Sequence, residues 1–246
     1  MKKEYVVIMG ILFLVGLFVG FGVQDGLSPQ TKITEIRDTE EYVKPNITKI
    51  STDLVAVDEK GEGVTAELEV LAEPGNGRTS VNIDKLFFWV DTQSSIRSAK
   101  RVATNYLNIT GNRFNIVYTV NTDTTVVGGP SAGAMLAITT IKALQNESLK
   151  EKVTMTGTIN QDGTIGPVGG ILAKAYAAKE AGYETFLVPE GQGTRVYYEK
   201  SEDCREYKNL RVCSTDYEPK EMSIENEVGI DVEEVENIKE AMKYFE

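Results

Sequence analysis

The chain has 246 residues, of which 41% are hydrophobic and 26% are charged, and it contains 7 prolines. This composition excludes a disordered or collagen-like protein and allows one folded domain of ordinary size. The formal net charge is −11, which opposes binding to nucleic acid, because most of that affinity comes from counterions released by a basic surface. We therefore expect no DNA or RNA partner.

Histidine is absent from the sequence. Its absence excludes the Ser/His/Asp triad, the Cys/His dyad, metal sites built on histidine and acid/base chemistry by imidazole. A catalyst in this chain must therefore use serine, threonine, lysine, tyrosine or carboxylate side chains. We expect no metal site and no cofactor.

A long apolar stretch near the N-terminus starts at Val6 and ends at Val23. As a helix its 18 residues would span about 27 Å, which is close to the thickness of the hydrocarbon core of a bilayer. A secretory signal has a shorter apolar core and a small-x-small cleavage site, and no good site follows here. The sequence therefore predicts an uncleaved transmembrane anchor at residues 1–24, followed by a polar tether at residues 25–50.

The charges that flank this stretch predict its orientation. Lys2 and Lys3 precede it, whereas the first cation on the far side is Lys32. Cytoplasmic flanks carry the excess of lysine and arginine, so the bias places residues 25–246 outside the cytoplasm. We expect a single-pass protein of the cell membrane with an extracytoplasmic soluble domain.

The two cysteines, Cys204 and Cys213, both lie in a polar stretch. An external location would let them close a small hairpin as a disulfide. In a reducing compartment they would be two ordinary thiols, and their spacing leaves both alternatives open.

The residues that follow the tether predict a single α+β domain at residues 51–246. Apolar runs and alternation predict strands at residues 54–57, 64–72, 79–83, 114–120, 153–159 and 185–189. The turn-rich residues 74–78 predict a hairpin between the second and the third of these strands. Apolar residues at helical spacing predict helices at residues 91–107, 134–144 and 171–182, and a last helix from residue 231. After Pro189 and before that last helix we expect irregular, acidic structure.

Ser131 stands in the segment GGPSAG, directly before a predicted helix. The small residues around it allow another backbone, such as a peptide substrate, to come close. N–H groups at a helix N-terminus stabilise developing negative charge, so the backbone at Gly129, Pro130 and Ser131 is a candidate oxyanion site.

A serine nucleophile needs a base, and without histidine the strong candidate is a lysine whose pKa is lowered by burial. Lys174 lies within the apolar segment GGILAKAYAA, which makes it the candidate. Taken alone, however, a Gly-rich turn before a helix is more often a structural cap, and a lysine in an Ala-rich helix is usually solvated. Composition and spacing alone therefore favour the structural interpretation.

Two longer segments change that balance, GGPSAGAMLAITTIKAL and VTMTGTINQDGTIGPVGGILAKAYAAKEAGYETFLVPEG. They resemble the proteolytic domain of Lon-type serine peptidases, in its membrane-anchored archaeal or bacterial form. In that family a PSAG serine and a lysine after a GG-containing turn form a Ser/Lys dyad, and the separation of 43 positions from Ser131 to Lys174 matches the pattern. The resemblance covers roughly residues 53–190 and 229–246. It implies the Lon proteolytic-domain fold, which is ribosomal protein S5 domain 2-like, with Ser131 and Lys174 as the dyad and Thr156 orienting it.

The sequence also departs from the family pattern. An acidic residue often precedes the family serine by three positions and another often follows Met-Thr-Gly, but Gly128 and Thr158 stand there. Residues 191–228 have no clear family counterpart. The unfoldase module of Lon and a G-x-x-x-x-G-K-[ST] motif are both missing from the sequence, so we expect no use of ATP.

Together these features predict an ATP-independent, membrane-anchored serine endopeptidase that cleaves unfolded or flexible polypeptides. The resemblance also implies assembly into a homo-oligomeric ring. One alternative is a non-catalytic Lon-fold module for binding or assembly at the membrane. It is motivated by Gly128, where the family often has an acidic residue, and by the missing unfoldase module. Another takes GGPSAG as a phosphate loop, as in sugar and mevalonate-type kinases, but it explains neither Lys174 nor Thr156.

Overall fold

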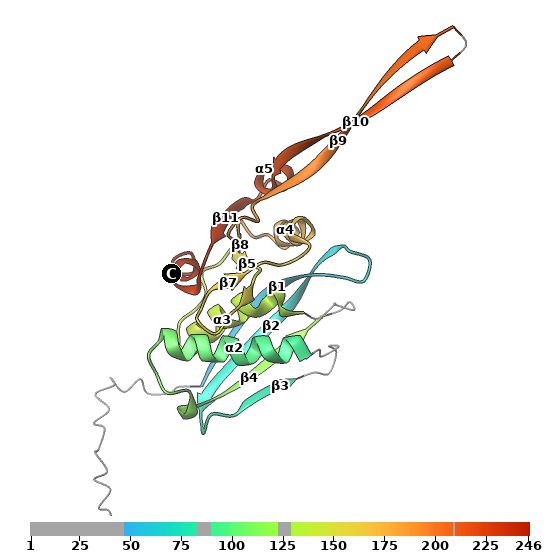
Figure 1. Cartoon of the computed structure of the whole chain (residues 1–246). Coiled ribbons are helices and arrows are strands. Elements are labelled where there is room, and N and C mark those ends of the chain that lie inside the picture. Colours follow the sequence, from blue (N-terminus) through green and yellow to red (C-terminus); the bar gives the residue numbers. More distant parts are fainter. Residues whose placement is uncertain (1–46, 83–89, 123–128, 209) are drawn as a thin grey trace, which may run out of the picture. The chain divides into compact units, whose positions relative to one another are not determined.

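A computed structural model of the chain describes residues 47–82, 90–122, 129–208 and 210–246 (Figure 1). These residues belong to one compact unit, Tyr42–Glu246, which holds two hydrophobic clusters and so carries its own core. The other unit, Met1–Glu41, lies outside the described residues, and so does the predicted membrane anchor. Among the helices that the structure describes, none is long and apolar enough to cross a membrane.

The larger sheet has four strands in the order β1-β2-β4-β3. Its strands are β1 (Thr48–Val57), β2 (Gly63–Pro74), β3 (Thr79–Asn82) and β4 (Phe114–Asn121). β1 and β2 form an antiparallel hairpin, and every second residue of β2 from Ala66 to Ala72 is buried. One face of this sheet is therefore packed against the core, as the alternation in the sequence predicts.

The predicted hairpin between the second and third strands is wrong, because β4 lies between β2 and β3. β4 pairs antiparallel with β2 and parallel with β3. The side-chain oxygen of Asn115, near the start of β4, accepts hydrogen bonds from the N–H groups of Asn76 and Arg78, each at 3.1 Å. The turn at residues 74–78 therefore wraps around the end of β4 and does not join two neighbouring strands.

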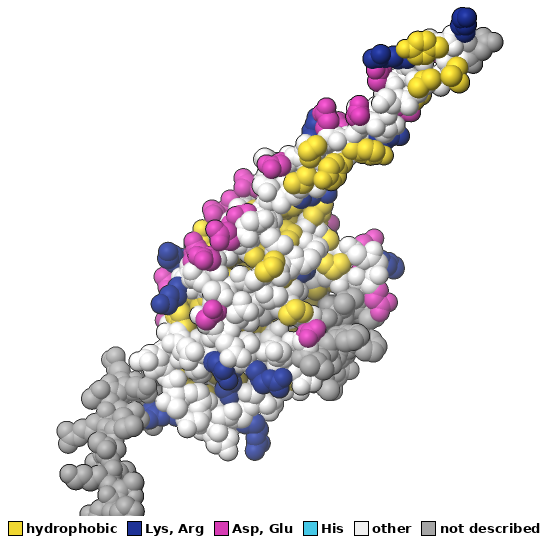
Figure 2. Space-filling view, in the orientation of Figure 1, with side chains coloured by type: hydrophobic (Ala, Val, Ile, Leu, Met, Phe, Trp, Pro, Cys, Tyr) yellow, Lys and Arg dark blue, Asp and Glu magenta, His cyan; other side chains and the backbone are white. Residues whose placement is uncertain are grey.

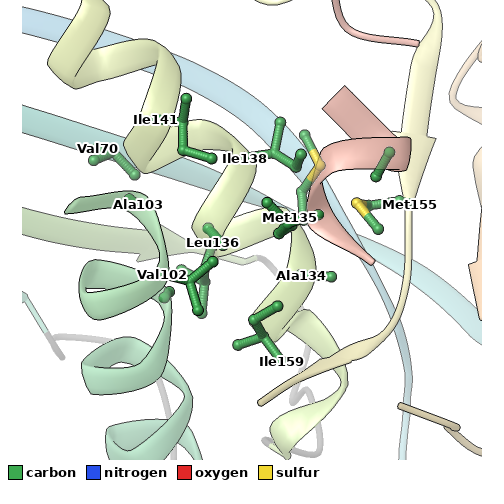
Figure 3. Packing of buried hydrophobic residues seen from close by; sticks show 14 of the residues in the cluster. Val70, Val102, Ala103, Ala134, Met135, Leu136, Ile138, Ile141, Met155 and Ile159 are labelled. Carbon is green, nitrogen blue, oxygen red and sulfur yellow. The ribbon is translucent and has the colours of Figure 1, made fainter. Parts of the chain in front are cut away.

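The main core is built around α3 (Gly133–Gln145), which packs against α2 (Val90–Tyr106) and against β1 and β2. Figure 3 shows side chains of α3, such as Leu136, beside Val102 of α2. All residues of α3 from Gly133 to Leu144 are buried. Both helices confirm the predictions at residues 91–107 and 134–144 to within about a residue.

A second, smaller sheet has three parallel strands in the order β11-β8-β5. They are β5 (Val153–Met155), β8 (Thr185–Pro189) and β11 (Asp231–Val235), and beside them β6 (Thr158–Ile159) pairs with β7 (Ile165–Gly166). The strand predicted at residues 153–159 is thus interrupted at Thr156 and Gly157. α4 (Ile171–Glu180) follows, confirms the helix predicted at residues 171–182, and packs against β1 and β2.

The helix predicted from residue 231 is wrong, since β11 occupies its first part and a short α6 (Ile238–Met242) its second. Val232 and Val235, three residues apart, belong to different hydrophobic clusters, as opposite faces of a strand require. Asn237 then caps α6, because its side-chain oxygen accepts hydrogen bonds from the N–H groups of Lys239 and Glu240, each at 3.1 Å. The spacing of apolar residues in the sequence does not by itself distinguish the strand β11 from the helix α6.

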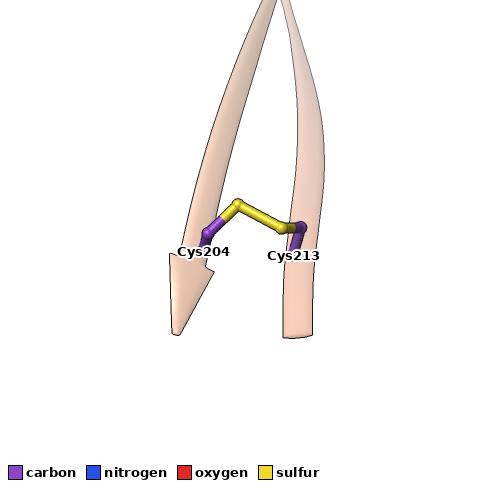
Figure 4. Close-up of a disulfide and its surroundings, with 2 residues drawn as sticks. All are labelled: Cys204 and Cys213. Atoms are coloured by element: carbon purple, nitrogen blue, oxygen red, sulfur yellow. A yellow bond between two sulfur atoms is a disulfide. The ribbon is translucent and has the colours of Figure 1, made fainter. Parts of the chain in front are cut away.

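Residues that were expected to be irregular form a long antiparallel hairpin of β9 (Thr194–Tyr207) and β10 (Leu210–Ser223), followed by α5 (Ile224–Val228). Most side chains on both faces of the hairpin are exposed. Cys204 and Cys213 lie directly opposite each other and form a disulfide (Figure 4). Of the two alternatives that the spacing left open, the disulfide is the one in the structure. The mixed helices and strands agree with the predicted α+β class.

Candidate active site

Ser131 lies in a short 3-10 turn, η2 (Pro130–Ala132), that leads directly into α3. Gly129 before the turn is extended, and Pro130 occupies the first position of the turn, where a missing N–H costs little. On the α2 side, the hydroxyl of Ser95 donates to the carbonyl of Asp91 at 3.0 Å and lies 3.5 Å from the carbonyl of Pro130. The serine therefore sits at the N-terminus of α3, as the sequence predicts.

Thr156 and Gly157, the residues between β5 and β6, contact the turn that contains Ser131. The carbonyl of Ser131 accepts hydrogen bonds from the N–H of Gly157 at 2.8 Å and from the hydroxyl of Thr156 at 3.2 Å. The N–H of Ala134 donates to the carbonyl of Gly157 at 3.0 Å. A Cβ atom on Gly157 would lie 2.6 Å from a methyl carbon of Ile165, so glycine permits this close approach.

Lys174 comes from α4, which begins after Gly170 with its φ of +69°. The lysine is only 3% exposed, and its Nζ atom donates to the Oγ1 atom of Thr156 at 3.3 Å. Thr156 thus accepts a hydrogen bond from Lys174 and donates one to the carbonyl of Ser131. The structure brings together the three residues that the sequence singled out as catalytic or orienting.

The pKa of Lys174 is lowered from 10.5 to about 8, and burial is the cause. Burial removes water from the ammonium group, and in the described part of the chain no carboxylate forms an ion pair with it. A large fraction of the amine is therefore neutral slightly above neutral pH, and a neutral amine can accept a proton.

Ser131 and Lys174 line the same cavity, which has a volume of about 470 Å³. The rest of its wall is formed mainly by small or backbone-exposing residues, namely Val57, Gly129, Pro130, Thr158, Pro167, Val168, Gly169 and Gly170. Pro130 has no N–H, so the candidate oxyanion donors of the predicted site are the N–H groups of Gly129 and Ser131. Of the two departures from the family pattern, Thr158 faces this cavity and Gly128 lies outside the described residues.

A larger cavity of about 680 Å³ lies elsewhere, beside Asp53, Glu67 and Glu180. It contains neither Ser131 nor Lys174, so its size does not make it the better candidate for a hydrolytic site. Within the described ranges, the group of side chains suited to a metal consists of Glu202, Cys204 and Cys213, whose two thiols are joined as a disulfide. Oxidised sulfurs are not the thiolate ligands that metals bind.

Sequence reasoning missed Gln192, which supports the wall of the cavity. Its side-chain oxygen accepts from the N–H of Val168 and its side-chain nitrogen donates to the carbonyl of Val168, both at 2.9 Å. This two-point contact fixes the loop between β7 and α4, which lines the cavity next to Lys174. A glutamine in the segment PEGQG carries no sequence signal for that role, because its partner lies 24 residues away.

Comparison with known proteins agrees with this geometry. Residues 91–215 match the family model of the Lon protease (S16) C-terminal proteolytic domain, and the chain therefore belongs to this family of serine-type peptidases. The match includes β9 and the first part of β10, which lie between the two ranges, 53–190 and 229–246, that the sequence resemblance covers.

The chain is also similar to several full-length Lon proteases. Lon protease 2 of Herpetosiphon aurantiacus is 31% identical over 144 residues, which are 57% of this chain and 17% of that protein. Lon protease of Halothermothrix orenii is 29% identical over 131 residues, which are 52% of this chain and 17% of that protein. A mitochondrial Lon protease homolog of Ostreococcus lucimarinus is 36% identical over 87 residues, which are 35% of this chain and 9% of that protein. The chain thus spans less than a fifth of the length of these relatives.

Proposed function

We propose that this protein is a serine endopeptidase that hydrolyses peptide bonds in unfolded or flexible polypeptides without ATP, held at the membrane by residues 1–24. The observation that carries the proposal is the hydrogen-bonded connection from Lys174 through Thr156 to the backbone of Ser131, with Ser131 and Lys174 in the wall of one cavity. A buried lysine that has no ion-pair partner among the described residues is costly. The role of base for a serine nucleophile is a function that requires such a lysine.

In the proposed mechanism, the Oγ atom of Ser131 attacks the carbonyl carbon of the scissile bond. The neutral Nζ atom of Lys174 takes the hydroxyl proton and returns it to the departing amine as the C–N bond breaks. Water then attacks the acyl-enzyme ester with the same lysine as base, and the acid product and free serine are released. The N–H groups of Gly129 and Ser131 stabilise the oxyanion in both halves of the reaction.

Thr156 orients the base in this scheme. Its hydroxyl proton is directed at the carbonyl of Ser131, so only its oxygen lone pairs face Lys174. The lysine must therefore donate one of its N–H bonds to Thr156, and the lone pair of the neutral amine stays free for the serine proton. Loss of Thr156 would leave the amine free to rotate, which weakens proton transfer without removing the base.

The polypeptide substrate is proposed to bind in an extended form. The cavity wall contains several glycines and prolines, which leave backbone groups accessible to another chain. A folded surface cannot present its backbone at the bottom of such a cavity, whereas a flexible segment can.

The cellular location is part of the same proposal. The apolar stretch from Val6 to Val23 supports a single-pass anchor, and the flanking lysines support an extracytoplasmic domain. The disulfide between Cys204 and Cys213 supports that side of the membrane, because disulfides persist in oxidising compartments. Independence from ATP is supported by the sequence, which contains no phosphate-binding G-x-x-x-x-G-K-[ST] motif. Ring assembly is proposed by analogy with related domains.

The test is cleavage of an unfolded protein by the full chain in detergent or lipid nanodiscs, without ATP. We expect Ser131→Ala and Lys174→Met to reduce turnover by about 100-fold or more, because each removes a group that acts on the reacting atoms. Lys179→Met is the matched control, since Lys179 lies on the same helix but bonds to the carbonyl of Val228. Undiminished cleavage by Ser131→Ala would refute the assignment, and a folded but inactive wild type would favour the non-catalytic binding module.

A further inference from the structure

Large hydrophobic side chains are exposed mainly on the β9–β10 hairpin. Six of the eight such residues in the described part of the chain belong to it, namely Val196, Tyr198, Tyr207, Leu210, Val212 and Tyr217. Figure 2 shows hydrophobic side chains gathered over the middle of the hairpin and near its end. These side chains are between 49% and 66% exposed, so they add little to the stability of the fold and are available to a partner.

The strand register divides these residues into two groups. Tyr207 lies opposite Leu210, and Val212 follows on the same face of the ribbon at its closed end. We call the residues from Cys204 to Cys213 the hairpin tip. The other group, which includes Tyr198 and Tyr217, lies on the opposite face and nearer to the domain.

The hairpin tip is also basic, although the chain as a whole carries a charge of −11. It contains Arg205, Lys208 and Arg211 but one carboxylate, Glu206. Arg205 forms an ion pair with Asp203 at 3.4 Å, whereas Lys208 and Arg211 form none with any residue that the structure describes. Exposed cations and exposed apolar side chains therefore both occur at the end of the hairpin, with Arg211 on the opposite face from Tyr207, Leu210 and Val212.

We propose that the hairpin tip inserts into the interface of an anionic phospholipid bilayer. Tyr207, Leu210 and Val212 enter the boundary between headgroups and acyl chains, where tyrosine is enriched in membrane proteins. Lys208 and Arg211 contact the negatively charged headgroups. The disulfide keeps the two strands paired up to the tip, so their backbone groups remain hydrogen-bonded to each other in the less polar interface.

The size of the tip favours a membrane over a protein partner. A stable protein interface uses about 20–30 residues from each side, and the tip offers about ten, of which only three are large and apolar. A bilayer needs no complementary shape.

The inference rests on the proposed membrane location, because residues 24–46 can extend over at most about 80 Å and would hold the domain within reach of the same bilayer. Weak insertion then suffices, since the anchor supplies a high local concentration.

The experiment uses the compact unit, residues 42–246, which lacks the predicted anchor, so it measures the tip independently of residues 6–23 and of catalysis. Vesicles of phosphatidylcholine with about one third phosphatidylglycerol are sedimented with the protein, and vesicles of phosphatidylcholine alone are the comparison. We expect binding to the anionic vesicles that falls about thirtyfold in Lys208→Gln/Arg211→Gln, which corresponds to about 1 kcal/mol for each cation. Tyr207→Ser/Leu210→Ser/Val212→Ser should reduce binding at least tenfold.

The matched control is Tyr198→Ser/Tyr217→Ser, which removes similarly exposed aromatic side chains from the opposite face of the same hairpin. It should bind vesicles as the parent protein does, and all variants should melt at the same temperature because these positions are exposed. Leu210→Trp should show blue-shifted fluorescence with anionic vesicles. The proposal is overturned if the parent protein does not bind, if the control loses as much binding as the tip variants, or if the tip substitutions instead abolish a lipid-free dimer.

Discussion

The Nζ atom of Lys174 lies 3.3 Å from the Oγ1 atom of Thr156, and both side chains are buried. The same threonine donates to the carbonyl of Ser131, so a single hydroxyl group connects the candidate base to the backbone of the candidate nucleophile. Burial of the amine in this environment lowers its pKa to about 8. The catalytic behaviour and the stability of the protein should therefore both depend on the protonation of Lys174.

Peptidase activity should rise with pH through an apparent pKa of about 8. The base must be neutral, and the burial of Lys174 places its pKa near that value. At pH 7 about a tenth of the amine is neutral, so kcat/KM should be about tenfold below its plateau. The measurement is a pH profile of kcat/KM from pH 6 to 10 with an uncharged peptide substrate. A profile that is flat between pH 7 and 9 would contradict this role for the lysine.

Lys174→Met should abolish activity but stabilise the fold at pH 7. The pKa of Lys174 is lower in the folded state, so the unfolded state binds more protons between pH 8 and 10.5, and stability rises with pH across that window. Below pH 8 the buried lysine costs up to about 3 kcal/mol, offset by about 1 kcal/mol from its bond to Thr156. Thermal or urea unfolding of the wild type and of Lys174→Met at pH 7 and pH 10 measures these differences in stability.

The stabilisation by Lys174→Met should shrink as the pH approaches 10, because the wild-type lysine is then neutral in both states. Lys179→Met is the control for the removal of a cation from the same helix. A Lys174→Met protein that is less stable than wild type at pH 7 would show that the lysine is not desolvated.

Thr156→Val should lower kcat by about 10- to 100-fold with a smaller change in KM. Valine has nearly the shape of threonine but cannot accept the hydrogen bond from Lys174, so the base loses its orientation and remains present. Thr156→Ser keeps the hydroxyl group and should retain most of the activity. Steady-state kinetics of the two variants separate an orienting role from a packing role, which predicts equal losses in both.

Gln192→Ala should raise KM several-fold, because the loop that lines the cavity loses both hydrogen bonds to Val168. The free energy of unfolding should fall by about 1–2 kcal/mol, the usual net contribution of two such bonds. Gln161→Ala is the control, since Gln161 bonds to Arg101 at the surface. Wild-type kinetics in Gln192→Ala would show that the wall of the cavity holds its position without this residue.

The sequence predicts the elements that depend on local patterns. α3 and α4 and the strands around them follow from continuous apolar runs and from glycines at their ends. Ser131, Lys174 and Thr156 were singled out by the family resemblance, and the burial of Lys174 by its apolar neighbours. These signals lie within a few residues of the side chains that they concern.

Features that depend on distant pairing could not be predicted in this way. The insertion of β4 between β2 and β3 depends on Asn115, which binds a turn nearly 40 residues earlier in the chain. The strand at Asp231–Val235 forms because β8 offers a free edge, while its apolar spacing also fits a helix. The β9–β10 hairpin could not be recognised in the sequence, because strands that expose polar and charged residues on both faces show little apolar alternation.

The interruption at Gly157 has a consequence for the motions of the active site. The N–H of Gly157 and the N–H of Ala134 both bond across the gap between the serine turn and the second sheet. These two amides can exchange their hydrogens with solvent only when the hydrogen bonds between Gly157 and the serine turn break. These bonds lie at the N-terminus of the buried helix α3. Ser131 should therefore be as rigid as the core itself, and slow hydrogen exchange at Gly157 and Ala134 would report on the geometry of its carbonyl without any substrate.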